Sequence, residues 1–94
     1  MKIETIKKEK CIFDFTGYTE EPYYHTLTQY ADIVETNKGN HFIMFYDSEA
    51  EKAGNYKIDK ETYERLDKED EVKFNKIKKI INKSEKSKIK LGFN

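Results

Sequence analysis

The feature that most constrains this chain is a continuous apolar run, Phe42-Ile43-Met44-Phe45, inside the segment His41 to Tyr46. A short unbroken apolar run is typical of a central strand that is covered on both faces. Such a strand needs neighbours on each side and elements above and below it. The sequence therefore predicts a sheet with residues 41–46 in its interior.

Two segments before the run are candidate neighbours. Residues 10–16 alternate apolar and polar side chains with period two, which predicts a strand that Gly17 closes; residues 2–9 fit a helical turn as readily as a strand. Residues 22–36 fit a helix, with Pro22 in its first turn and Gly39 beyond its end, but their Tyr, Thr, Ile and Val content favours a strand. We predict a strand over about 30–36, joined to the next strand through residues 37–40.

After the central run, the sequence predicts a cap at Asp47-Ser48, a short helical turn through Ala53 with Gly54 at its end, and a brief edge strand over 56–58.

The rest of the chain has a helical pattern. Asp59 is a predicted N-cap, with a helix break near Lys68. Asp70 is a second candidate cap, which would put the acids around Glu71 in the first turn of a second helix. Residues 88–94 are expected to form a terminal strand or a frayed tail.

These elements predict one α+β domain over 1–94, with a small antiparallel sheet of three to five strands and one or two C-terminal helices packed on one face. Apolar residues make up only 36% of the chain, but it has six Phe and seven Tyr, so we expect a small, aromatic core. One cysteine excludes an intramolecular disulfide and favours the cytoplasm. No apolar run has the length of a secretion signal or a membrane span, so a membrane is not expected as a partner.

The segment from Gly17 to Tyr30 is rich in tyrosine. Tyrosine offers a large contact area with little rotamer entropy, so exposed clusters of it mark partner surfaces; the alternative is that these rings cover the core. The predicted partner-binding residues are Tyr18, Glu20, Glu21, Tyr23, Tyr24 and His25, with an adjoining acidic surface between Asp47 and Glu71.

The last quarter of the chain is basic. Residues 72–94 hold eight lysines and one glutamate, a net charge of +7. Lysines at helical spacing can bind phosphate groups, and the candidates for nucleic-acid binding are Lys73, Lys76, Lys79 and Lys83. The alternative is a solvated helix face, which the near absence of arginine favours.

Catalytic chemistry has little sequence support. Cys11 with His25 or His41 could form a nucleophile and base pair, but Cys11 as a small buried apolar residue and histidines at element edges explain the same residues. No spacing predicts a metal site, and the four single glycines form no phosphate-binding loop, so we expect no metal and no cofactor.

The predicted function is therefore a non-enzymatic module that binds another protein. A short, lysine-rich chain of this kind would suit an accessory or inhibitor (anti-defence type) protein of a phage or other mobile element. The alternatives are nucleic-acid binding through the basic C-terminal helix and a small Cys/His enzyme. Homo-oligomerisation is also compatible with so small a core.

Overall fold

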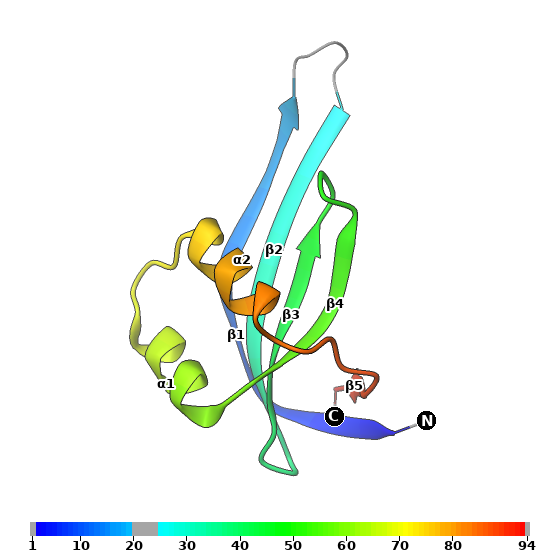
Figure 1. Cartoon of the computed structure of the whole chain (residues 1–94), viewed down its shortest axis with the longest axis vertical. Helices are drawn as coiled ribbons and strands as arrows, with labels where there is room; N and C mark the ends of the chain where they lie inside the picture. Colours follow the sequence, from blue (N-terminus) through cyan, green and yellow to red (C-terminus); the bar gives the residue numbers. More distant parts are fainter. Residues whose placement is uncertain (1, 20–24, 94) are drawn as a thin grey trace.

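The computed structural model describes residues 2–19 and 25–93 (Figure 1). Five strands and two helices follow one another along the chain. They are β1 (Ile3–Thr19), β2 (His25–Thr36), β3 (His41–Asp47), β4 (Lys52–Ile58), α1 (Lys60–Lys68), α2 (Phe74–Asn82) and β5 (Lys90–Gly92). Both helices come after the four main strands, which confirms the predicted α+β class.

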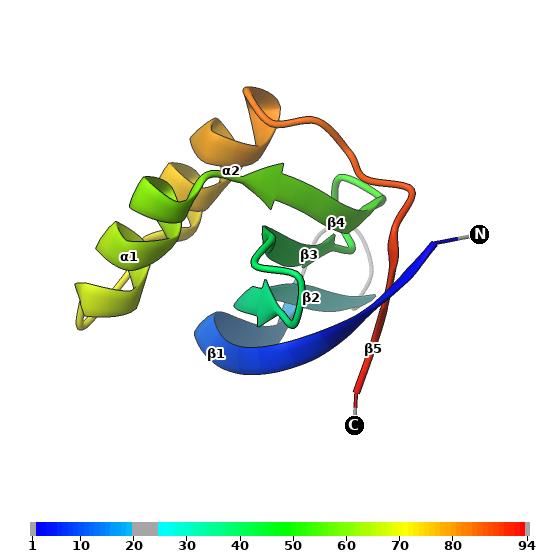
Figure 2. The same ribbon diagram turned by 90° about the horizontal axis from the view of Figure 1, so that it is seen from below.

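The five strands form one sheet in the order β4-β3-β2-β1-β5. The first four pair antiparallel, whereas β5 pairs parallel with Ile3, Glu4 and Thr5 of β1, so the sheet is mixed. β3 lies between two neighbours, as its apolar run predicted. Both helices lie on one side of the sheet, and β5 runs beside the start of β1 (Figure 2).

β1 and β2 form a hairpin much longer than the sequence indicated. The undecided residues 2–9 belong largely to β1, and the strand predicted over about 30–36 begins already at His25. β2 is a strand and not a helix because both of its edges are occupied, by β1 and by β3. The predicted turn at residues 37–40 is confirmed: Thr36 N–H donates to Asn40 O, and Gly39 has a φ of 78°.

The segment after β3 corrects the prediction of a helical turn that runs to Ala53. Asp47 Oδ1 does accept from the backbone N–H groups of Glu49 and Ala50, as a cap would, but the chain then reverses and enters β4 at Lys52. Gly54 therefore lies within β4, opposite Phe45, and ends no helix. Pairing with β3 satisfies the backbone of these residues more completely than one helical turn could.

The helices follow the predicted break but differ at one cap. Asp59 caps α1 by accepting from Thr62 N–H at 2.7 Å, and α1 ends at Lys68. Asp70 caps nothing: α2 begins after Lys73 and has no acidic residue in its first turn, which corrects the predicted start. Burial of Val72 and Phe74 sets this start, so the acids stay in the connection.

The apolar core has two unequal parts, one on each face of the sheet. The larger lies between the sheet and the helices and includes Phe45, Phe74 and Ile77. The smaller, on the opposite face, contains Ile6, Val34 and Phe42, with Ile89 and Leu91 packed on it. The C-terminal segment thus covers the face that the helices leave open.

Candidate functional site

The far end of the β1–β2 hairpin is the first candidate site. We call residues Phe13–Thr19 of β1 together with His25–Ala31 of β2 the distal ribbon. Its end extends past β3, whose last residue, Asp47, lies opposite Gln29 (Figure 1). Tyr18 is 75% exposed and Phe15 46%, so both aromatic rings are accessible to a partner.

Gly17 lies inside the distal ribbon and does not close β1, which corrects the prediction. It pairs with Leu27, and the ring of Phe15 covers it. A Cβ atom at this position would come within 2.7 Å of Phe15 Cζ. The glycine therefore makes room for an exposed aromatic ring along the strand.

The outer side of Phe13–Thr19 is an open strand edge. β5 pairs only with residues 3–5 of β1, and no other described strand pairs with this side. Thr28 directs its N–H and C=O toward Ser48, on the β3 side. Its antiparallel partner Thr16 must then direct both groups outward, as must Asp14 and Tyr18 two residues away.

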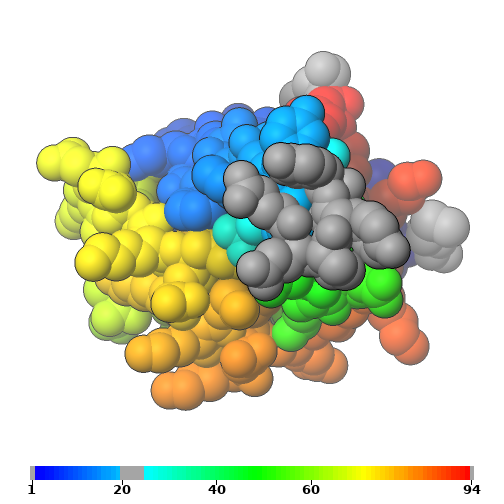
Figure 3. Space-filling view, turned by 90° about the horizontal axis from the view of Figure 1, so that it is seen from above, coloured from blue at the N-terminus to red at the C-terminus, as the bar shows by residue number. Residues whose placement is uncertain are grey.

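A groove of about 500 Å³ lies at the base of this edge. Phe13 and Asp14 line it on one side, and Asp70, Glu71 and Lys78 on the other. Figure 3 looks onto this end of the molecule and shows β1 beside the connection between the helices. Two acids of the predicted acidic surface thus lie next to the distal ribbon.

The structure places only part of the predicted partner-binding set. Tyr18 and His25 are both exposed and lie on the distal ribbon, in β1 and β2. Glu20, Glu21, Tyr23 and Tyr24 lie outside the described residues. Reasoning from the sequence missed Phe15 and the outward backbone of Asp14, Thr16 and Tyr18, although the absence of lysine from 11 to 19 was a usable signal.

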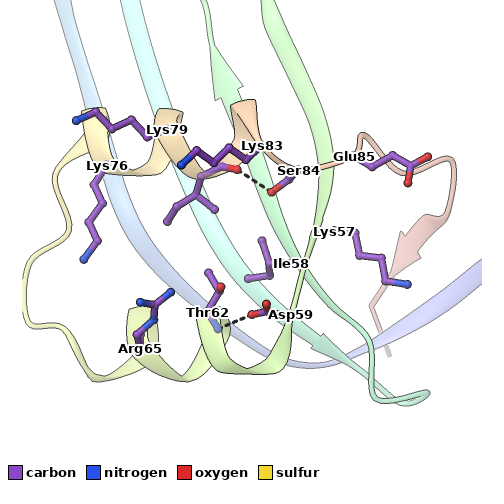
Figure 4. A pocket seen from close by; sticks show the side chains of 11 residues that line it. Lys57, Ile58, Asp59, Thr62, Arg65, Lys76, Lys79, Lys83, Ser84 and Glu85 are labelled. Atoms are coloured by element: carbon purple, nitrogen blue, oxygen red, sulfur yellow. Dashed lines mark hydrogen bonds between the residues drawn. The ribbon is translucent and has the colours of Figure 1, made fainter.

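A second groove, of about 600 Å³, lies between α1, α2 and the end of β4 (Figure 4). Its lining includes Ile58, Thr62 and Ile80, and its charged residues are Lys57, Arg65, Lys76, Lys79 and Lys83 against Asp59 and Glu85. We call it the basic groove. It brings together three of the four predicted nucleic-acid-binding lysines, while Lys73 lines the other groove. The sequence pattern missed Lys57 and Arg65, because other elements supply them.

The third cluster lies on the sheet face opposite the helices. Asp32 is 1% exposed and accepts a hydrogen bond from Tyr30 Oη through Oδ2, while no described group bonds to its Oδ1. A hydrogen bond to Asp32, burial and the charge of Asp32 raise the pKa of Glu9 to about 7.

Cys11 does not meet either histidine. Cys11 pairs with Asp32 and His41 with Glu35, three residues along β2, so their side chains point to opposite faces of the sheet. His25 begins β2, about 23 Å along the strand from Asp32. Cys11 is exposed, which corrects the prediction of a buried residue; burial of its sulfur, with the charge of Asp32, still raises the pKa of the thiol.

His41 is held by contacts within the fold. It is buried at the start of β3, its Nε2 lies 2.9 Å from Glu35 Oε2, and its ring packs against Tyr63 of α1. The hydrogen bond to His41 lowers the pKa of Glu35. Across 2–19 and 25–93, no three His, Cys, Asp or Glu side chains are placed to hold a metal ion.

Comparison with known protein families, with curated proteins and with solved structures finds no match for this chain. In the described part of the chain, no helix has the length and apolar character needed to cross a membrane.

Proposed function

We propose that this protein is a binding module that takes an extended segment of another protein as an added strand along the open edge of the distal ribbon. The observation that carries the proposal is the contrast between the two halves of the outer side of β1. Natural proteins protect exposed strand edges with lysines, bulges or covering elements, because unpaired N–H and C=O groups recruit other strands.

The first half of β1, residues 3–12, has all three kinds of protection. Its outer side pairs with β5 at residues 3–5, and register shifts in its pairing with β2, after Ile6 and after Cys11, make the strand irregular. Lysines stand at positions 7, 8 and 10, and Lys10 Nζ donates to Asp67 O at 2.6 Å. A foreign strand cannot extend along this half without displacing them.

The second half has none of them. Residues 13–19 keep a regular register with β2, contain no lysine or proline, and pair with no other described strand. Strand addition gains main-chain hydrogen bonds along such an edge, while side-chain contacts supply specificity. The exposed rings of Phe15 and Tyr18 would provide those contacts.

The charge beside the edge indicates what partner would fit. Asp14 lies on the strand, and Asp70 and Glu71 line the adjoining groove opposite it. The same groove is also lined by two basic residues, Lys73 and Lys78. A partner segment would therefore be apolar along Phe15 and Tyr18 and carry a basic residue beside Asp14. An accessory or inhibitor role of the whole protein stays a prediction, because no comparison informs it.

The test uses Thr16→Pro against Thr16→Ala. The backbone N–H of Thr16 points away from β2, so proline at this position removes an outward donor without breaking a hydrogen bond to β2. Edge strands tolerate proline at positions whose N–H points outward. Immobilised wild-type protein and Thr16→Ala should retain the same lysate protein, and Thr16→Pro should lose it. Equal circular dichroism spectra and melting temperatures of the two variants would show that both fold.

Two results would contradict the proposal. Retention of the same partner by Thr16→Pro would show that the edge is not the contact. A concentration-dependent dimer of the purified protein, abolished by Thr16→Pro, would assign the edge to a second copy of this chain instead. Light scattering of the wild type and both variants measures this.

A further inference from the structure

The basic groove concentrates positive charge that the protein itself does not neutralise. Five cationic side chains and two acidic ones line it. Lys76 pairs with Glu69, but Lys57, Arg65, Lys79 and Lys83 form no ion pair within 4 Å among the described residues. Like charges gathered in one hollow repel one another, and an anion bound there would relieve that repulsion.

The helices give this arrangement a defined geometry. Lys76, Lys79 and Lys83 are three, then four, residues apart, so they follow one stripe of α2 and its C-cap. Figure 4 shows Arg65 on α1 and Lys76 on α2 reaching toward each other across the opening. Cationic groups from two helices and from Lys57 at the end of β4 thus border one space.

The chemistry of these groups points to phosphate. The guanidinium of Arg65, the only arginine in the chain, presents a planar fork of donors that matches the oxygens of a phosphate group, and lysines add point charges. The hydroxyl-bearing Thr62 stands in the lining beside the apolar Ile58 and Ile80. A volume of about 600 Å³ lies within the ordinary range for small-ligand sites.

We propose that the basic groove binds a ligand that carries several linked phosphate groups. The cationic groups of the lining come from both helices and from β4, so a chain of phosphates could contact several of them at once, which a single phosphate could not. Two sources share this chemistry, a small polyphosphate and the backbone of a single-stranded nucleic acid. This proposal is independent of strand addition, because the groove and the distal ribbon share no residue.

The probes are inorganic triphosphate, measured by titration calorimetry, and a fluorescent single-stranded oligothymidylate, measured by anisotropy. The test variant is Lys79→Gln with Lys83→Gln, which removes two positive charges from the groove. The matched control is Lys73→Gln with Lys78→Gln, two lysines around α2 that line the other groove. Arg65→Gln alone separates the guanidinium from the charge of the lysines.

We expect at least one probe to bind, with affinity that falls as salt rises. The test variant should weaken that binding by about tenfold or more, as loss of charged hydrogen bonds does, and the control should leave it nearly unchanged. Binding of triphosphate alone identifies a small polyphosphate, and tighter binding of the oligonucleotide identifies a nucleic acid. No binding of either probe, or an equal loss in the control, would overturn the proposal.

Discussion

The two faces of the sheet differ in the kinds of side chain that are buried on them. The face under the helices is closed by aromatic and aliphatic side chains: Phe45 stacks on Phe74 at 5.2 Å, and Phe13 packs on the same ring. The opposite face has a small apolar cluster and several buried polar groups, among them Glu4, Asp32 and Thr36. Apolar packing therefore dominates the stability of one face, and hydrogen bonds and charge weigh more on the other.

The largest effect should come from the helix face. Ile77 of α2 is fully buried, so Ile77→Ala should lower the free energy of unfolding by about 2–5 kcal/mol through lost packing and a cavity. The melting temperature should fall by about 10 °C or more in thermal unfolding followed by circular dichroism. Phe93→Ala, at a side chain that is 66% exposed, is the control and should have little effect.

The next effect lies on the opposite face. Glu4 is buried, and its carboxylate accepts from Thr36 Oγ1 at 2.7 Å and from Asn40 Nδ2 at 2.9 Å, which ties β1 to the β2–β3 turn. Glu4→Gln should cost about 1–2 kcal/mol, measured by urea unfolding, because the amide presents a donor to Asn40. A cost as large as that of Ile77→Ala would contradict the difference between the faces.

Glu4 also gives the pH dependence a sign. The hydrogen bond from Thr36 lowers the pKa of Glu4, so its contribution is present above the unfolded pKa near 4.5 and is lost as the pH falls below it. The stability of Glu4→Gln should therefore fall less than that of the wild type as the pH is lowered below about 4.5, which urea unfolding at several pH values measures.

Glu9 should act in the opposite direction. Because the neighbouring Asp32 raises the pKa of Glu9 to about 7, the folded protein keeps a proton that the unfolded chain releases above about pH 4.5. Between about pH 4.5 and 7 the folded state binds up to about one proton more than the unfolded chain. The free energy of unfolding should therefore fall as the pH rises through this range. Melting temperatures of Glu9→Gln should fall less over this range, whereas Glu49→Gln, at an exposed turn residue, should follow the wild type.

The smallest effect concerns a rate and leaves stability almost unchanged. Burial and Asp32 raise the pKa of the Cys11 thiol, so less thiolate is present at neutral pH although the residue is exposed. A thiol reagent should label native Cys11 more slowly than the same cysteine in a short peptide, and Asp32→Asn should speed the labelling. Fast labelling of the wild type would reopen the Cys/His enzyme hypothesis.

Local pattern was enough for several elements. The apolar run at 42–45 predicted β3, Asp59 predicted the cap of α1, and the polar stretch after Leu66 predicted the break between the helices. Each signal arises from neighbouring residues: an unbroken apolar run, a side chain that bonds two or three residues away, a stripe that stops. The start of α2 and the segment after Asp47 escaped prediction because burial and strand pairing outweighed the local cap signals.

The candidate sites were predicted less completely. The α2 lysines could be grouped from helical spacing, but Arg65 and Lys57 joined them only through the packing of α1 and β4 beside α2. The acidic pair of Glu9 and Asp32 had no signal at all, since two strands bring together residues 23 positions apart. Strand register, which depends on distant residues, decides such meetings.

By itself the sequence determined the class of fold, the position of the central strand, the break between the helices and the uneven distribution of charge, because each depends on residues close together in the chain. Only the tertiary structure decided which half of β1 is left without a neighbour and which cations border one groove. Both depend on how far the strands extend and how the helices pack. These features are set by contacts between residues far apart in the chain, so no short segment of the sequence predicts them.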